Sequence, residues 1–472
     1  MLCKQFRAVD MSPIRFLLCE LFNGSFILRL MLKAKASLVF FLISWIIVLK
    51  YQPITENVYL TLTYNAFLAI ISFYCINFAL NSELRANKLL RHVIAAVSSV
   101  GLIIAFGSLF IGKPAVYEKW ASLGSGTMYL EGKVAIFGDL SHLTSAAKCD
   151  YPIIVGTYVC DPWLRFFNQN PIVAEFLKAI NLTNVQVLGI SSLTLLCIIL
   201  FAVINKLEVK SIAPYIMFMT PVSVLAIDRG NEVITIIFIL IGFFALQTKS
   251  TIRQTMGALS LFFACIFKLW PIVLVFFTLI FFWKRVKLIP KCILILSLLY
   301  WIPQIDLAVK MLNATNSGSP FGRSFGLQLI WDLTWPITSF NYGVAIIFLS
   351  LSLLLTYVRI SKSSLNQFTL SASGVATLYS LIPVMLTFSL IWAFGDSYIY
   401  RMIILIPVVL LLGQFKFTEF AFPNFLLSAI LVTCIVSLTP LVLVATSALA
   451  LYFVYLTVTT VLAQRKMKSF VS

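Results

Sequence analysis

The chain has 472 residues, of which 61% are hydrophobic and only 11% are charged, and its mean hydropathy is +1.00. A soluble domain cannot bury this much apolar surface, so the composition excludes soluble proteins and predicts an all-α, polytopic protein embedded in the lipid bilayer. We expect the formal net charge of +18 to mark cytoplasmic loops, and no nucleic-acid partner is predicted.

The N-terminal segment 1–35 mixes basic and apolar side chains, and two interpretations are open. It could be a cytoplasmic amphipathic helix that lies on the inner leaflet. Alternatively, Met31 rather than Met1 is the true start, because residues 31–35 resemble a basic lead-in to a first span. No small-residue cleavage site follows the first apolar run, so we expect no cleaved signal peptide.

Residues 36–463 form the expected transmembrane domain. Apolar stretches long enough to cross about 30 Å of hydrocarbon predict about fourteen spans, with twelve as the lower bound. The expected spans are 37–55, 57–80, 93–112, 185–204, 212–228, 232–247, 255–268, 271–283, 288–303, 342–357, 369–391, 401–414, 422–439 and 441–463. Several are short, and broken helices are tolerated at membrane depth only where they line a cavity.

The orientation follows from the basic residues, because cytoplasmic loops retain Lys and Arg. Basic clusters recur in alternate loops, at 33–35, 85–91, 206–210, 249–253, 284–287, 359–362 and 465–468. Both termini, including the basic tail 464–472, are therefore predicted to be cytoplasmic. Two large loops, 113–184 and 304–341, then face outward, and long ordered loops often carry function.

The first outward loop contains a predicted surface helix at 137–147, with Leu140 and Leu143 on its apolar face. Asp139 is the candidate general base, because transfer to a hydroxyl needs a carboxylate within reach of the hydroxyl proton. Asp139 is equally well explained as the N-cap of this helix. His142 lies one turn further on, and we expect it to be solvated rather than catalytic.

Two of the nine cysteines lie in the same outward loop. An oxidising compartment would permit Cys149 and Cys160 to form a disulfide, and this is the outcome we expect. The alternative is two free thiols in a reducing compartment.

The segment Asp228-Arg229-Gly230-Asn231-Glu232 separates two apolar runs. Charges at the ends of spans are costly unless they face water or a partner, so these residues are functional candidates. The Arg229 guanidinium could bind two phosphate oxygens at once, with Asn231 as a further donor, or it could only snorkel toward the headgroups. We expect Asp228 to orient Arg229 rather than to act as the base.

Two further cations lie at the outward ends of expected spans. Lys268 precedes Trp270 and Pro271 and supplies a point charge at a helix end, although snorkelling alone would also explain it. Arg401 begins an apolar run and could meet the same anionic group. Asp396 is a supporting residue that could merely cap the helix that follows.

The sequence lacks the motifs of several common kinds of active site. The chain has no phosphate-binding loop, no His-Glu-x-x-His, no Cys-x-x-Cys and only two histidines. We therefore expect neither a metal nor a cofactor, and carboxylates and cations at the outward surface remain as the candidate chemistry.

These motifs resemble glycosyltransferase family 87, a group of multi-spanning GT-C enzymes. The segment 228–231 and Lys268-Leu269-Trp270-Pro271 resemble its Arg-Gly-Asn and Lys-x-aromatic-Pro pattern, and 138–146 stands where these enzymes carry an acidic residue. Cys149, 160–168 and 400–405 resemble a bacterial branch. At 168–171 and at Ile399 the sequence differs from the pattern of that branch. The branch's way of recognising its acceptor is therefore not inferred for this chain.

The resemblance implies an inverting, metal-independent transfer on the outward, periplasmic face of a bacterial inner membrane. The donor would be a monosaccharide linked to polyprenyl phosphate, and the acceptor a glycan or glycolipid. Asp139 would deprotonate the acceptor hydroxyl, while Arg229, Lys268 and Arg401 would stabilise the leaving phosphate. Two other classes stay open, a lipid-linked glycan transporter or flippase and a polysaccharide polymerase or ligase.

Overall fold

The computed structural model describes part of the chain, and the ranges below bound every statement about its structure. They are 128–130, 133–135, 137–149, 153–156, 160, 169–218, 220–313, 324–325, 340–394, 397–415, 421–435 and 441–471. The segment 1–35 and the expected spans at 37–55, 57–80 and 93–112 lie outside the described residues. The total number of spans therefore stays a prediction.

The described part is a helical membrane protein. Four helices are long and apolar enough to cross a membrane, namely α8 (Val185–Lys206), α17 (Phe340–Leu370), α18 (Ala372–Phe394) and α21 (Leu441–Val471). The shorter apolar helices are α11 (Asn231–Leu246), α12 (Thr251–Phe267), α13 (Pro271–Phe282), α14 (Leu288–Leu299) and α20 (Ala421–Ile435). The other helices are α6 (Gly138–Lys148), α7 (Pro171–Ala179), α9 (Ala213–Phe218), α10 (Pro221–Arg229), α15 (Ile305–Asn313), the 3-10 helix η4 (Ile399–Leu405) and α19 (Ile406–Leu412).

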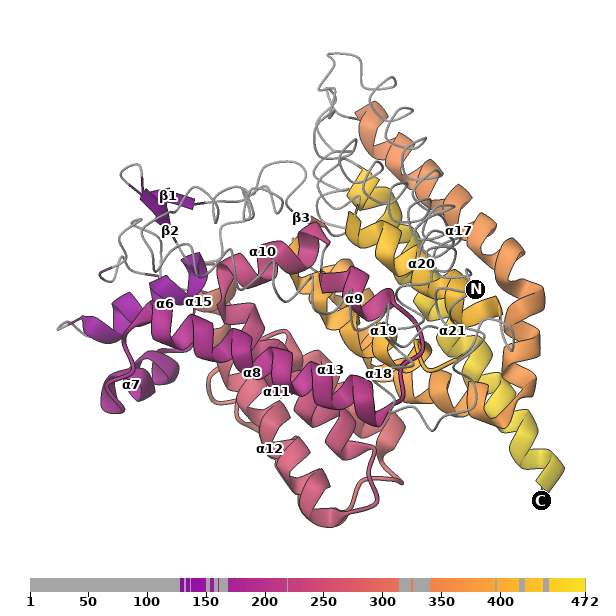
Figure 1. Ribbon diagram of the computed structural model, residues 1–472, viewed down its shortest axis with the longest axis horizontal. Coiled ribbons are helices and arrows are strands. Elements are labelled where there is room, and N and C mark those ends of the chain that lie inside the picture. Colours follow the sequence, from indigo (N-terminus) through magenta and orange to yellow (C-terminus); the bar gives the residue numbers. More distant parts are fainter. Residues whose placement is uncertain are drawn as a thin grey trace, which may run out of the picture.

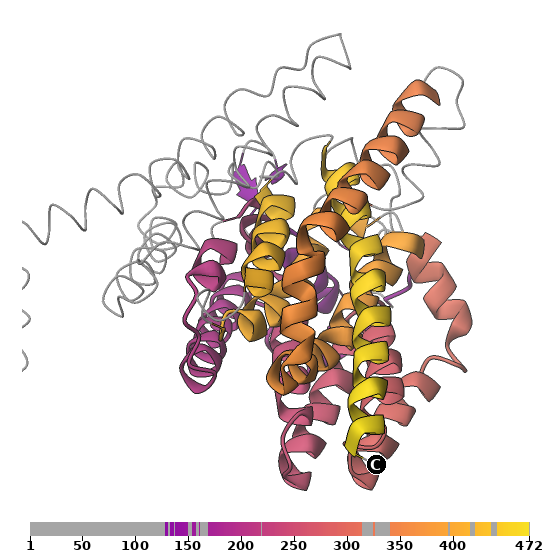
Figure 2. The ribbon, with the colours of Figure 1, turned by 90° about the vertical axis from the view of Figure 1, so that its right-hand side faces the viewer.

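The helices form two neighbouring groups (Figure 1). In one group α11 packs between α8 and α12, and α12 also packs against α14. In the other, α21 packs against both α17 and α18, and the two longest helices run side by side in Figure 2. The contact of α13 with α18 joins the groups.

Two short antiparallel ribbons are the exceptions to the all-α prediction. Strand β1 (Met128–Leu130) pairs with β2 (Lys133–Ala135), and β3 (Ser324–Phe325) pairs with β4 (Ser397–Tyr398). The second ribbon joins the predicted loop 304–341 to the segment that leads directly into η4.

The predicted span 212–228 is wrong as a single helix, because the chain breaks between α9 and α10. Pro221 has no N–H group to donate to the Met217 carbonyl oxygen, so the α-helical hydrogen bonding stops there. That oxygen instead accepts hydrogen bonds from the hydroxyl groups of Thr220 and Ser223, each at 2.7 Å. The result is a separate, buried α10 that contacts α6.

The predicted span 401–414 is likewise not one α-helix. It begins in η4 and continues as α19. Pro407 lies in the first turn of α19, where its missing N–H is tolerated, and it leaves the Ile403 carbonyl without an α-helical donor. Arg401 is therefore carried on a tight 3-10 segment and not in a regular span.

The predicted end of the span 342–357 is also wrong, since α17 continues to Leu370 through the basic residues that we assigned to a loop. The Tyr452 hydroxyl of α21 donates a buried hydrogen bond of 2.6 Å to Ser361 Oγ. Because this polar pair is satisfied within the interface of α17 and α21, the extra turns of α17 remain packed.

Candidate functional site

The predicted surface helix is present as α6, and its apolar face is buried as expected. Leu140 and Leu143 are fully buried, and Ala147 is nearly so. The alternative interpretation of Asp139 as the N-cap is wrong, because Phe137 occupies that position without a side-chain capping bond. Asp139 lies in the first turn, where the helix dipole favours a negative charge.

Two glycines allow Phe137 to fix the start of α6. Gly189 of α8 lies against the Phe137 ring, so closely that any Cβ at this position would overlap the ring. Gly230, with φ +79°, separates α10 from α11, and a Cβ there would lie 3.0 Å from Phe137 and 3.1 Å from Leu140. The sequence thus provides a backbone surface against which α6, and Asp139 with it, can dock.

We expect Gly230→Ala to lower the free energy of unfolding by about 1–3 kcal/mol, because the φ of residue 230 strains any residue with a side chain. The added methyl group would also press on Phe137 and displace α6. Thermal unfolding of the purified protein in detergent measures the loss. Gly156→Ala is the matched control, because Gly156 has φ +83° but a methyl group added there would meet no atom within 4 Å. An equal loss in both variants would contradict the role of the Phe137 contact.

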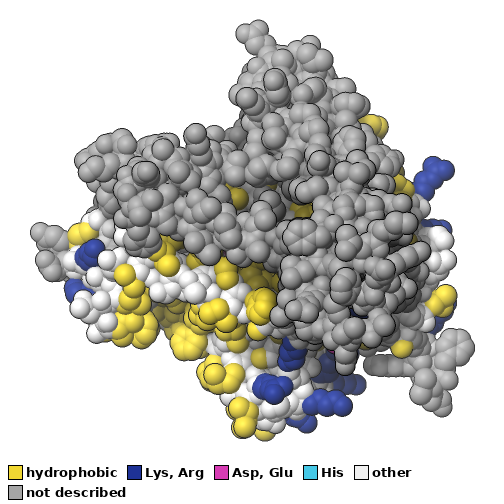
Figure 3. Space-filling view, viewed as in Figure 1, with side chains coloured by type: hydrophobic (Ala, Val, Ile, Leu, Met, Phe, Trp, Pro, Cys, Tyr) yellow, Lys and Arg dark blue, Asp and Glu magenta, His cyan; other side chains and the backbone are white. Residues whose placement is uncertain are grey.

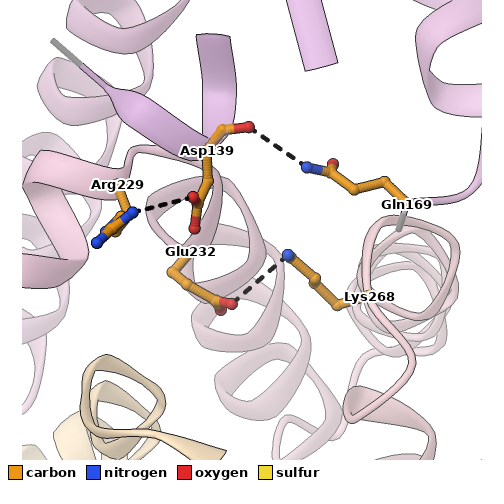
Figure 4. A network of polar contacts seen from close by, with 5 residues as sticks. All are labelled: Asp139, Gln169, Arg229, Glu232 and Lys268. Atoms are coloured by element: carbon orange, nitrogen blue, oxygen red, sulfur yellow. Dashed lines mark hydrogen bonds and ion pairs between the residues drawn. The ribbon is translucent and has the colours of Figure 1, made fainter. Parts of the chain in front are cut away.

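An ion pair joins the candidate base to the candidate phosphate ligand (Figure 4). Arg229 Nη1 lies 3.4 Å from Asp139 Oδ1, and the two side chains are only 12% and 17% exposed. Gln169 Nε2 donates a hydrogen bond of 3.3 Å to the backbone oxygen of Asp139. The first turn of α6 is therefore held by the last residue of α10 on one side and by Gln169, just before α7, on the other.

A second ion pair lies beside the first. Lys268 Nζ is 3.9 Å from Glu232 Oε1, and the Glu232 side chain is fully buried. Lys268 follows the last residue of α12 with an extended backbone, and Pro271 then begins α13, as predicted. Trp270 also places its indole near the Glu232 carboxylate. The ends of α11 and α12 thus bring Lys268 to the site.

Arg401 belongs to the same neighbourhood. The helix η4 that carries it contacts both α10 and α11. Arg401, Lys268 and Asp139 are all close enough to Glu232 to act on its carboxylate electrostatically. The structure therefore gathers the three predicted cations from three separate segments around two carboxylates.

The predictions for the supporting residues have different outcomes. The prediction that His142 is solvated is wrong, because its side chain is only 3% exposed within the packing of α6. Asp228 is buried at the end of α10, and its role in orienting Arg229 stays a prediction. Asn231 opens α11, but its side chain and the whole of Asp396 lie outside the described residues.

The loop around α6 is tied down at three points. Cys149 and Cys160 form the predicted disulfide, with their Cα atoms 5.9 Å apart. Lys178 Nζ of α7 donates a 2.9 Å hydrogen bond to the Cys149 carbonyl oxygen. Asn170 caps α7 and donates a 3.1 Å hydrogen bond to the Tyr300 hydroxyl, just beyond α14. The first two contacts connect the segment after α6 to itself and to α7, and the third attaches the start of α7 to the end of α14.

Replacing both disulfide cysteines with serine should destabilise this loop by about 3 kcal/mol, because the unfolded loop regains its freedom. Limited proteolysis of the reconstituted protein, with the cut sites mapped by mass spectrometry, measures the loosening. Cys292→Ser is the control, since Cys292 is an exposed free thiol. Unchanged protection of the loop in the double variant would contradict the structural role of the disulfide.

Sequence reasoning missed two contributors to the site. Glu232 was noted within the polar segment but received no role, although a carboxylate in the first turn of an apolar helix is itself a signal. Gln169 gave no signal, because it contacts a backbone atom thirty residues away in sequence. Within the described ranges, no group of three His, Cys, Asp or Glu residues could hold a metal ion.

No family model, no curated protein and no solved structure matches this chain. The resemblance to glycosyltransferase family 87 therefore rests on the motifs alone, and the geometry of the site has to carry the functional argument.

Proposed function

We propose that this protein is an inverting, metal-independent glycosyltransferase of the GT-C type. It transfers a monosaccharide from polyprenyl phosphate to a hydroxyl of a glycan or glycolipid on the periplasmic face of a bacterial inner membrane. The observation that carries the proposal is the partly buried pair of Asp139 and Arg229, with Lys268 and Arg401 in the same neighbourhood.

The chemistry needs a base and an anion site close together. The acceptor oxygen forms a bond to the anomeric carbon while the bond from that carbon to the phosphate oxygen breaks. Asp139 takes the hydroxyl proton, and Arg229, Lys268 and Arg401 stabilise the negative charge that grows on the leaving phosphate. A guanidinium suits this task because it can bind two phosphate oxygens at once.

The distribution of exposed charge supports an outward site. Glu232 and Lys268 lie at one end of α11 and α12. Exposed basic residues gather at the opposite end of the α11, α12 and α13 group, and they are Lys249, Arg253, Lys284, Arg285 and Lys287. Figure 3 shows small groups of Lys and Arg side chains at the left and right edges, and its main cluster of these side chains along the lower edge of the molecule. Under the positive-inside rule that edge is cytoplasmic.

The proposal is tested with the protein in proteoliposomes that contain polyprenyl-phosphate-linked hexose and a lipid and glycan extract of its host. We expect release of polyprenyl phosphate together with transfer of labelled hexose to the extract. Movement of a lipid-linked glycan across the bilayer without release would instead show a flippase. Activity only with a diphosphate-linked oligosaccharide would show a polymerase or ligase.

A further inference from the structure

The proposed mechanism gives no role to the most buried charged group of the site. The Glu232 side chain has no exposed surface, and neither of its carboxylate oxygens has a hydrogen-bond partner among the described residues. The indole of Trp270 lies beside this carboxylate. Buried carboxylates are costly unless they are paired and hydrogen-bonded, so this arrangement calls for a functional reason.

The geometry limits what Glu232 can do. Because its side chain is completely enclosed, it cannot touch a substrate directly. Lys268, in contrast, is 16% exposed and lies 3.9 Å from Glu232 Oε1, a distance at which charges attract without a hydrogen bond. Glu232 therefore acts on a ligand mainly through Lys268, its ion-pair partner.

The two ion pairs share one pattern, which Figure 4 shows directly. Arg229 is paired with Asp139 at 3.4 Å, and Lys268 is paired with Glu232 at 3.9 Å. Each cation of these pairs is held by a carboxylate from a different element. An incoming phosphate must therefore compete with carboxylates that are already in place.

We infer that Glu232 is a positioning residue that holds Lys268 in the empty site and yields it to the donor phosphate. This inference rests on the proposed function, since it takes the phosphate to be that of a polyprenyl phosphate. When the lipid phosphate binds, Lys268 moves its ammonium group from the carboxylate to the phosphate oxygens. After transfer, Glu232 competes with the product phosphate for Lys268 and so speeds product release.

The inference predicts that removing the charge of Glu232 strengthens the binding of a lipid phosphate. Glu232→Gln keeps the shape of the side chain but no longer attracts Lys268, so undecaprenyl phosphate should bind about tenfold more tightly. Glu232→Asp keeps the charge and should bind nearly as the unmodified protein does. The dissociation constant of undecaprenyl phosphate, measured with the protein in lipid nanodiscs, is the readout.

The steady-state constants kcat and KM supply a second readout, because a purely structural role of Glu232 would not lower both of them. Because release of the product becomes slower, kcat should fall in Glu232→Gln while KM for the donor also falls. In a Lys268→Met background, Glu232→Gln should tighten binding much less, because its main effect passes through Lys268. Asp306→Asn, at an exposed carboxylate of α15, is the control and should change neither quantity.

The outcomes separate the inference from the proposed function. Equal or weaker binding of undecaprenyl phosphate to Glu232→Gln, with the unmodified protein binding normally, overturns the inference and leaves the function standing. The same tightening in the Lys268→Met background also overturns it. Failure of the unmodified protein to bind undecaprenyl phosphate at all overturns both.

Discussion

Asp139→Asn should reduce the rate of glycosyl transfer by roughly 10²–10⁴-fold, the usual contribution of a positioned general base. The amide keeps the size of the side chain but cannot take the acceptor proton. It also weakens the attraction to Arg229, which lies 3.4 Å away. Donor affinity should therefore be unchanged or higher, so the loss should appear in kcat and not in KM.

The measurement is steady-state transfer in proteoliposomes, with undecaprenyl phosphate binding measured alongside. Asp306→Asn makes the same chemical change at an exposed carboxylate and should leave transfer intact. Full activity of Asp139→Asn would show that Asp139 is not the general base. A parallel fall in donor binding and in thermal stability would show instead that Asp139 serves mainly to dock α6.

The sequence predicted those parts of the site that depend on local pattern. The helix around Asp139 was predictable because Leu140 and Leu143 recur at helical spacing next to an acidic first turn, and α6 differs from the predicted 137–147 by one residue at each end. Lys268 could likewise be placed at a helix end, because Pro271 marks the start of the next helix.

The sequence could not predict contacts that depend on distant packing. Arg229 and Asp139 are separated by ninety positions, and only the docking of Phe137 against Gly189 and Gly230 brings them together. The burial of His142 has the same origin, since neighbouring elements and not its own helix decide its exposure. Hydrophobic periodicity reports which face of a helix is apolar, but not which element will cover it.

The wrong span boundaries have a different cause. A hydropathy window averages over Pro221 and Pro407, although each removes one backbone donor and ends regular α-helix on its N-terminal side. In α17 the predicted span was too short instead. The charges near Ser361 lower the average hydropathy, while a buried hydrogen bond from Tyr452 to Ser361 keeps the helix packed. Helix continuity follows hydrogen bonding, and hydropathy reports it only indirectly.

Arg229→Ala should lower kcat/KM for the donor by roughly 10²–10³-fold, as expected when one main donor to a developing oxyanion is removed. Part of the loss should be in donor binding, because the phosphate is charged in both the ground state and the transition state. The kcat/KM of Arg229→Lys should lie between those of the unmodified protein and Arg229→Ala, since a lysine retains the charge but not the fork that binds two oxygens. Donor binding and transfer kinetics in proteoliposomes measure both effects.

Arg253→Ala is the matched control, because Arg253 is an exposed arginine in the first turn of α12, at the end opposite to Lys268. Unchanged donor affinity in Arg229→Ala would contradict its assignment as a phosphate ligand. The comparison with Asp139→Asn is decisive for the division of roles within this ion pair. If Arg229 binds the phosphate and Asp139 takes the proton, the first variant loses affinity and rate while the second loses rate alone. Equal losses of donor affinity and of rate in both variants would mean that the pair acts only as a structural link between α6 and α10.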